Sequence, residues 1–422
     1  MDRFVIEGPT PLEGEIAVGG AKNAVLPLMA AALLAEGDSV IENVPDLHDV
    51  RFFMTILEGL GATCSLVDNR LVISTTGLDS CEAPYDLVRK MRASIYVLGP
   101  LLAARGRARV SLPGGCAWGP RPVNLHLEGL GALGAELELS EGYITGRCGT
   151  GDHARLRGGR FRFEPSSVGG TANVLMAAVL AEGVTELENC AVEPEVTQLA
   201  EALAAAGARI EGVGTTTLRI EGVERIDPLN HRVMADRIEA GTFMAGVAAA
   251  GGRITLLGVD TEHLRPVSAV LLDMGCEIRE EGDRLTVEMD RRPRPVEVTT
   301  RPYPGFPTDM QAQVMAVCAL ASGTSFITET IYTDRFTHVA ELQRLGADIR
   351  TDGARATVFG VQQLQGAPVM ATDLRASAAL VLAGVAAQGE TTVNRVYHID
   401  RGYERIETRL ARLGASIRRE KS

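Results

Sequence analysis

One short phrase recurs six times along this chain at a nearly constant spacing. It reads Leu-x-x-x-Gly-Ala, with Cys once in place of Ala, and its glycines are Gly61, Gly134, Gly207, Gly275, Gly346 and Gly414. Successive glycines lie 73, 73, 68, 71 and 68 residues apart. A fixed period of this length predicts six repeated structural units. Features common to all six repeats are therefore expected to be scaffold, and features of a single repeat are candidates for chemistry.

Each repeat contains a segment with helical spacing that is apolar on nearly every face. These segments are 24–35, 93–104, 173–181, 241–250, 312–321 and 376–387. A helix without a polar face must be buried on all sides. A glycine follows each one in a position suited to a helix C-cap, at Gly37, Gly106, Gly183, Gly252, Gly323 and Gly389. A strand, an amphipathic helix and a β-hairpin are expected to complete each repeat.

Three buried helices wrapped by sheets and amphipathic helices predict an inside-out α/β barrel. Six repeats then give two such domains, which suits a chain of 422 residues. The opening segment resembles the end of the fifth repeat, so residues 1–21 are expected to complete the sixth. We therefore expect one domain over 22–233 and a second over 1–21 with 234–422, with the active site in the cleft between them.

Composition excludes several classes of function. The formal net charge of −12 argues against a nucleic-acid partner. The longest apolar run has 12 residues, too few to insert into a membrane. Seven cysteines without a C-x-x-C pair argue against a disulfide framework or a bound metal, and the chain opens without a signal peptide. The G-x-G-x-x-G match at 129–134 lies on a helix end, so no dinucleotide or other cofactor is expected. These features indicate a protein of the reducing cytoplasm.

Basic side chains stand at helix starts, where the helix dipole disfavours them. They are Lys22, Arg92, Arg121, Arg237, Arg335, Arg375 and Arg401. Each could simply be solvated or paired with an acid such as Asp373 or Asp400. Alternatively, together they line a cleft that binds phosphate and carboxylate groups through charge-assisted hydrogen bonds. Their number at equivalent positions favours the second interpretation.

The second repeat alone carries an insertion. Gly106 and Asn124 are separated by 18 residues, whereas the equivalent interval is 12 residues in the first and third repeats. The extra segment, 113–121, holds Cys116 and the only tryptophan of the chain. Glycines and prolines on both sides specify a loop. A thiol beside an arginine and a helix N-terminus ionises readily, which makes Cys116 a candidate nucleophile or acid.

Several long phrases resemble the UDP-N-acetylglucosamine 1-carboxyvinyltransferases, the enolpyruvyl transferases that begin peptidoglycan synthesis. The phrases are 20–24 (GAKNA), 112–116 (LPGGC), 306–313 (FPTDMQAQ), 371–377 (ATDLRAS) and 397–405 (YHIDRGYER). The resemblance covers essentially the whole chain and implies the six-fold α/β fold described above. It also implies transfer of the enolpyruvyl group of phosphoenolpyruvate to the 3′-hydroxyl of UDP-N-acetylglucosamine, with release of phosphate.

The resemblance also implies residue roles. Phosphoenolpyruvate is expected to bind Lys22, Arg121 and Arg401. Cys116 is expected to act as the acid and to form a 2-(S-cysteinyl)pyruvic acid O-phosphothioketal, and Asp309 to act as the base. Positioning of the reacting groups is expected from Asn23, Asp373 and Arg375. The nucleotide sugar is expected against Arg92, Arg121, Pro122, Val123, Asn124, Leu125, Ser166, Ser167, Val168, Gly169, Asp309, Ile331 and Arg335. Fosfomycin, which alkylates the family's cysteine, should inactivate the protein.

Two departures and two alternatives accompany this prediction. Asn124 stands where the family usually has Asp, and Pro165 stands where some members have Lys. The first alternative is 5-enolpyruvylshikimate-3-phosphate synthase, which shares the fold but lacks the cysteine loop. The second is a nucleotide-sugar sensor without catalytic activity.

Overall fold

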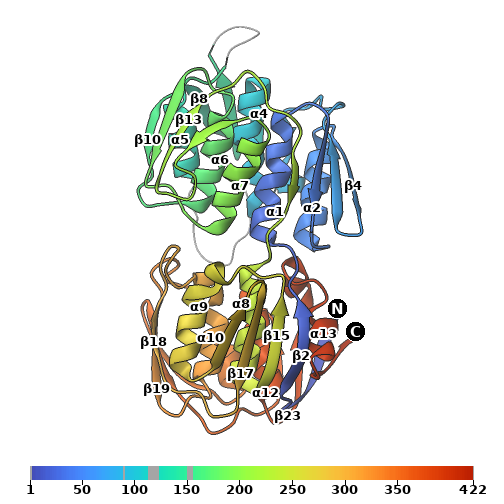
Figure 1. The fold of residues 1–422 in the computed structure, drawn as a ribbon, viewed down its shortest axis with the longest axis vertical. Helices are drawn as coiled ribbons and strands as arrows, with labels where there is room; N and C mark the ends of the chain where they lie inside the picture. Colours follow the sequence, from blue (N-terminus) through green and yellow to red (C-terminus); the bar gives the residue numbers. More distant parts are fainter. Residues whose placement is uncertain (1, 89–90, 113–122, 150–154, 422) are drawn as a thin grey trace. The chain divides into compact units, whose positions relative to one another are not determined.

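Three buried helices, each joined to a small sheet and an outer helix, form the pattern from which both halves of the chain are built (Figure 1). The computed structural model describes residues 2–88, 91–112, 123–149 and 155–421. It divides into two compact units, each described here by itself. The middle unit runs from Gly20 to Met234, and the terminal unit holds Gly19 and the residues before it together with Ala235 and the residues after it.

The middle unit takes its core from the first three repeats. Its main helices are α1 (Lys22–Ala31), α2 (His48–Gly59), α4 (Leu98–Arg105), α5 (Asn124–Ala132), α6 (Val168–Ala178) and α7 (Pro194–Ala205), with short helices η1 (Ala32–Leu34), α3 (Tyr85–Val88) and η2 (Arg92–Val97). Its strands are β3 (Asp38–Glu42), β4 (Thr63–Val67), β5 (Arg70–Ser74), β6 (Glu82–Ala83), β7 (Arg107–Ser111), β8 (Ala135–Ser140), β9 (Tyr143–Cys148), β10 (Arg160–Arg162), β11 (Val184–Glu188), β12 (Arg209–Glu211), β13 (Thr217–Glu221) and β14 (Asn230–Arg232).

The terminal unit repeats the plan. Its main helices are α8 (Arg237–Ala250), α9 (Thr261–Met274), α10 (Gln311–Cys318), α11 (Val339–Arg344), α12 (Leu374–Ala386) and α13 (Ile406–Arg412), with short helices η3 (Thr308–Met310) and η4 (Val396–Arg401). Its strands are β1 (Arg3–Gly8), β2 (Leu12–Ala17), β15 (Gly252–Leu257), β16 (Glu277–Glu281), β17 (Arg284–Met289), β18 (Glu297–Thr299), β19 (Thr324–Thr328), β20 (Asp348–Asp352), β21 (Arg355–Phe359), β22 (Pro368–Met370), β23 (Gly389–Asn394) and β24 (Ser416–Glu420).

The expected inside-out architecture is confirmed within each unit. In α6 every residue from Gly170 to Ala178 is buried, and in α12 every residue from Arg375 to Ala386 is buried. These helices supply small and aliphatic side chains on all faces, so burial of the whole surface is favourable. The described residues form six four-stranded sheets of one strand order, exemplified by β10-β11-β13-β12. The first pair in each sheet is parallel, and the hairpin adds the two antiparallel strands.

The chain closes on itself in the terminal unit. β1 pairs antiparallel with both β23 and β24, so the N-terminal strand fills the hairpin position of the sixth repeat. β2 goes further and pairs in parallel with β15 of the fourth repeat, which Figure 1 shows as a blue strand beside a yellow-green one. β14 joins β3 in the same way in the middle unit. Residues 1–21 thus complete the sixth repeat and also supply one strand to the fourth.

The glycines of the repeat phrase have the conformation that such a phrase requires. All six, from Gly61 to Gly414, have φ between 83° and 105°. This left-handed region favours glycine and lets the chain turn from the helix into the hairpin. The expected C-cap role of the second glycine set is wrong in all but one case. Gly106 caps α4 with φ 67°, whereas the other five glycines lie beyond the helix end, where the next strand starts.

No helix within the described residues is long and apolar enough to span a bilayer.

Candidate functional site

Lys22 stands at the first position of α1, where its ammonium group faces an acidic partner. Its Nζ lies 3.3 Å from Oδ2 of Asp49, which is in the first turn of α2. The two side chains are only 12% and 8% exposed. Asn23 follows Lys22 and is exposed. A largely buried cation at a helix N-terminus can bind an anionic ligand, because the helix dipole and the cation act on the anion together.

Three segments expected to bind the nucleotide sugar converge on a buried histidine, His126 in α5. A Cβ atom at Gly169 would lie 3.1 Å from its Nε2, so this glycine permits close contact with α6. Burial, and then the charge of Arg92, lower the pKa of His126 to about 4. The imidazole is therefore neutral at physiological pH.

Asn173 determines which nitrogen of His126 carries the proton. Its Oδ1 accepts from the Gly99 amide at 2.7 Å, and its Nδ2 donates to the Ile95 carbonyl at 2.9 Å. The same Nδ2 lies 3.0 Å from Nδ1 of His126, which must then accept. The ring proton is consequently on Nε2, the nitrogen nearest Gly169.

The other nucleotide-sugar residues of the middle unit lie at the starts of two helices. Ser167 caps α6 by accepting from the Gly170 amide at 3.1 Å, and Val168 is the first helical residue. Asn124 is the first residue of α5, where its Nδ2 donates to Oε1 of Glu128 at 3.2 Å. Val123, Leu125 and Ser166 are half-buried beside them. Serine capping leaves the remaining N–H groups of that turn available to a ligand.

Asp309, in η3 of the terminal unit, is held by two arginines. Its Oδ1 accepts from Nη1 of Arg335 at 2.9 Å, and its Oδ2 accepts from Nε and Nη2 of Arg375 at 3.1 and 3.0 Å. The arginine side chains are 7% and 3% exposed, whereas the Asp309 side chain is 28% exposed. Hydrogen bonds from the two buried guanidiniums fix the orientation of the carboxylate.

The guanidinium group of Arg375 packs against the aromatic ring of Tyr403. The guanidinium carbon lies 5.3 Å from the centre of the tyrosine ring. The Tyr403 hydroxyl lies 2.8 Å from Oγ1 of Thr242 and accepts from Nε2 of Gln313 at 3.3 Å. Burial acts to lower the pKa of Arg375, but Tyr403, Asp309 and Asp236 raise it above its ordinary value. Arg375 is therefore a permanent, immobile cation.

Asp373 caps the helix that carries Arg375. Its Oδ1 accepts from the amides of Arg375 and Ala376 at 2.9 and 3.1 Å, and its Oδ2 accepts from Oγ1 of Thr372 at 3.2 Å. The carboxylate thus starts α12 and orients its first turn. Asp373 pairs with none of the expected cations in these contacts.

Two expected helix starts are placed differently by the structure. α11 begins at Val339 and α13 at Ile406, so Arg335 lies in the turn before α11 and Arg401 ends the short helix η4. The alternative that the cations pair with acids holds for Lys22, Arg335 and Arg375. Their partners are Asp49 and Asp309, whereas Asp400 binds Arg419 with one contact of 3.1 Å. Ile331 is half-buried in the turn that precedes Arg335.

Cys116, Arg121 and Pro122 lie outside the described residues, but five other thiols can be compared with expectation. Burial raises the pKa of Cys148 to about 11 and the pKa values of Cys64, Cys190, Cys276 and Cys318 to about 12. At pH 8 only about one in a thousand or fewer of these thiols would be ionised. They fit the expected role of small core residues.

We expect Cys116 to be alkylated at least about tenfold faster than any of these five thiols, because only the thiolate reacts. Peptide mapping during a time course with iodoacetamide measures each rate, and the half-buried Cys81 serves as an internal comparison. A C116S variant should lose the fast phase. Equal rates at all seven positions would show that the loop does not activate its thiol.

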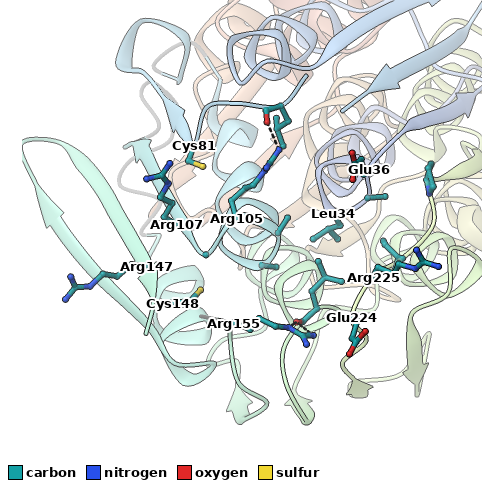
Figure 2. Close-up of a pocket in the computed structure, with 18 of the residues that line it drawn as sticks. Leu34, Glu36, Cys81, Arg105, Arg107, Arg147, Cys148, Arg155, Glu224 and Arg225 are labelled. Carbon is teal, nitrogen blue, oxygen red and sulfur yellow. Dashed lines mark hydrogen bonds between the residues drawn. The ribbon is translucent and has the colours of Figure 1, made fainter. Parts of the chain in front are cut away.

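A separate cavity of about 1030 Å³ opens where the buried helices of the middle unit end (Figure 2). Two of the arginines that line it donate hydrogen bonds to backbone carbonyls. Arg105 donates to Leu78 at 2.5 Å, and Arg155 donates to Leu180 and Val223 at 2.7 Å each. Arg292 makes equivalent bonds to Leu320 and Ala321 in the terminal unit. Arg155 and Arg292 thus satisfy carbonyls just after the ends of α6 and α10, and Arg105 satisfies a loop carbonyl.

Sequence reasoning missed several residues of the site. Asp49 resembled an ordinary first-turn acid, and Tyr403 lay within a quoted phrase without an assigned role. His126 directly follows the predicted segment that ends at Leu125 and could have been included. Glu329, which holds the segment before Arg335, had no distinguishing pattern around it.

Comparisons with known proteins identify the relatives of this chain. The profile of the family described as EPSP synthase (3-phosphoshikimate 1-carboxyvinyltransferase) matches residues 6–410. A protein of Anaeromyxobacter sp. (strain Fw109-5) named UDP-N-acetylglucosamine 1-carboxyvinyltransferase is 57% identical over 100% of both chains. Proteins of the same name from Trichlorobacter lovleyi and Halorhodospira halophila are 53% and 51% identical, each over 99% of both chains.

Solved structures support the fold. The enolpyruvyl transferase NikO from Streptomyces tendae is 27% identical and has a TM-score of 0.89, with coverage of 100% of this chain and 99% of the other. EPSP synthase from Acinetobacter baumannii, at 18% identity and a TM-score of 0.75 over 100% of both chains, shares the fold. With identities above half over full length, the chain belongs to the UDP-N-acetylglucosamine 1-carboxyvinyltransferase family of enolpyruvyl transferases.

Proposed function

We propose that this protein transfers the enolpyruvyl group of phosphoenolpyruvate to the 3′-hydroxyl of UDP-N-acetylglucosamine and releases phosphate, as the first committed step of peptidoglycan synthesis in the cytoplasm. The observation that carries the proposal is the carboxylate of Asp309, which is fixed by Arg335 and Arg375 and still partly exposed. Full-length identity to proteins named for this reaction supports it. Both substrates are small anions, and the reaction requires no cofactor.

In the proposed mechanism, the sugar hydroxyl attacks the central carbon of phosphoenolpyruvate while the methylene carbon gains a proton. Asp309 takes the hydroxyl proton, and Cys116 supplies the proton to the methylene. The resulting tetrahedral ketal then loses phosphate as the C–O bond breaks and a proton leaves the methyl group. Lys22, Arg121 and Arg401 bind the phosphate and carboxylate groups, and Arg375 stabilises charge during addition.

The nucleotide sugar is proposed to bind the helix starts around His126 in the middle unit, with Arg92, Ser167 and Gly169 against it. In the terminal unit, the Ile331 amide already donates to Glu329 at 2.9 Å. A contact from Ile331 to the sugar would therefore use its carbonyl oxygen or its side chain.

Phosphate release tests the proposal directly. We expect release when the protein is mixed with phosphoenolpyruvate and UDP-N-acetylglucosamine. Release only with shikimate 3-phosphate would instead assign the chain to 5-enolpyruvylshikimate-3-phosphate synthase, a reading that the 18% identity to that enzyme from Acinetobacter baumannii does not favour. Binding of UDP-N-acetylglucosamine without phosphate release from either acceptor would favour a sensor.

The D373N variant separates two roles of Asp373. Asparagine caps a helix as well as aspartate, so we expect D373N to keep the thermal stability of the parent, whereas D373A should lose about 1 kcal/mol. If the Asp373 charge also positions the reacting groups, D373N should lose about tenfold or more in kcat. Thermal denaturation and phosphate release measure the two effects. An unchanged kcat in D373N would restrict Asp373 to capping.

A further inference from the structure

Glu329 is a buried acid that joins two segments of the proposed site. It follows β19, and its side chain is inaccessible to solvent. Oε1 accepts from Oγ1 of Thr300 at 2.7 Å and from the amides of Ile331 and Tyr332 at 2.9 and 3.1 Å. Oε2 accepts from Oγ1 of Thr308 at 2.8 Å. These four bonds satisfy a carboxylate that would otherwise be costly to bury.

The Thr308 hydroxyl has only one possible hydrogen-bond direction in this arrangement. A carboxylate only accepts, so Thr308 must give its single proton to Glu329. Its oxygen is then free to accept from Nη1 of Arg335 at 3.0 Å. The same Nη1 donates to Oδ1 of Asp309 at 2.9 Å. The hydrogen bonds therefore run in one direction, from Arg335 through Thr308 to Glu329.

We propose that Glu329 is a positioning residue for the reaction: it fixes Thr308 as the second acceptor for Arg335 and thereby holds Asp309 in its reactive orientation. The proposal rests on the proposed function, in which Asp309 is the base. Glu329 also fixes the backbone at Ile331. The Glu329 carboxylate thus fixes the position of the proposed base and of a segment proposed to contact the sugar. It attaches both of them to the end of β19.

Glutamine at position 329 would reverse the hydrogen bond with Thr308 and keep the three hydrogen bonds from Thr300, Ile331 and Tyr332. The amide oxygen can occupy the position where three donors meet, so Thr300, Ile331 and Tyr332 keep their acceptor. The amide nitrogen then faces Thr308 as a donor, so the Thr308 oxygen must accept from both the new amide and Arg335, and its own proton loses its acceptor and must rotate away. Arg335 loses its fixed position although the volume of the side chain is unchanged.

The experiment compares E329Q, T308V and T308S with the parent. E329Q and T308V should each lower kcat about tenfold, with KM for both substrates within twofold of the parent value. Their double variant should be no worse than either single variant, because both act on one chain of hydrogen bonds. T308S retains the hydroxyl and should keep kcat within twofold.

Ser325→Ala provides a matched control in β19, the strand that Glu329 follows. Ser325 is also fully buried, and its Oγ accepts from the Val296 amide at 3.2 Å, away from Asp309. S325A should lower thermal stability as E329Q does and leave kcat unchanged. If E329Q and T308V behave like S325A, Glu329 has only a structural role and the proposal is overturned.

A second readout does not depend on turnover. Arg335 is shielded in the parent, so its modification by phenylglyoxal should be slow, and it should become several-fold faster in E329Q and T308V but not in T308S or S325A. Equal modification rates in all variants would contradict the proposal. An inactive parent that still shows the difference in Arg335 reactivity would overturn the proposed function while supporting the role of Glu329.

Discussion

Replacing Asp309 with asparagine is expected to lower kcat by about 10²- to 10⁴-fold, the range of a general base. Asparagine has the same shape but cannot take a proton from the sugar hydroxyl. It also leaves the guanidiniums of Arg335 and Arg375 beside a neutral group. Removing one member of a buried ion pair is costly, so we expect the free energy of unfolding to fall by about 3 kcal/mol. Phosphate release and urea denaturation measure the two effects.

Glu407→Gln is a suitable control for this experiment. Glu407 accepts from Nε of Arg419 at 3.1 Å and is 14% exposed, so it represents another largely buried ion pair of the terminal unit. E407Q should reduce stability and leave kcat within about twofold, since surrounding acids still neutralise Arg419. A D309N variant with a kcat near the parent value would exclude Asp309 as the base.

The second large effect is expected from lysine at position 375. Arg375 donates twice to one oxygen of Asp309 and lies over the Tyr403 ring, a geometry that a single ammonium group cannot reproduce. An Asp309 carboxylate with one support removed would be misplaced, so kcat should fall about 10²-fold. The free energy of unfolding should fall by about 3 kcal/mol, because the buried charge is less well paired.

R355K distinguishes this effect from a general intolerance of lysine. Arg355 also lies over an aromatic ring, 4.5 Å from the centre of Phe326, and pairs with Glu297 at 3.4 Å, but it is 51% exposed. Its replacement should change stability by less than about 0.5 kcal/mol and leave kcat unchanged. If R375K left kcat as little changed as R355K, the two hydrogen bonds from Arg375 to Asp309 would have no role in the reaction.

The fold could be predicted to a large extent because its determinants are local and repeated. A helix that is apolar on all faces, as in 376–387, can only be buried, and a glycine such as Gly207 marks the turn into a hairpin. Helix starts were less predictable. The segment from Arg335 to Val339 has helical spacing, but it forms turns because Arg335 bonds to Thr308 and Asp309 instead.

The sequence names candidate site residues but does not show how they pair. Asp309 is a candidate from its position at a helix start, but the sequence does not show that it pairs with Arg335 and Arg375, which are 26 and 66 residues away. Such contacts depend on which helices become neighbours. Asp373 illustrates the converse, since its contacts with Thr372, Arg375 and Ala376 are local and its role as a helix cap was predictable.

The position of β1 also has a consequence for the order in which the protein is made. β1 is central in its sheet, and β24 pairs in that sheet with β1, so Arg3 lies opposite Glu420. β1 must therefore wait until β23 and β24 have been made before its hydrogen bonds are complete. The middle unit, whose strands are contiguous in sequence, can finish folding earlier on the ribosome. The terminal unit can be completed only after β24 has been made, and the pairing of β1 with β24 offers a place to join the chain in circular permutants that keep the fold.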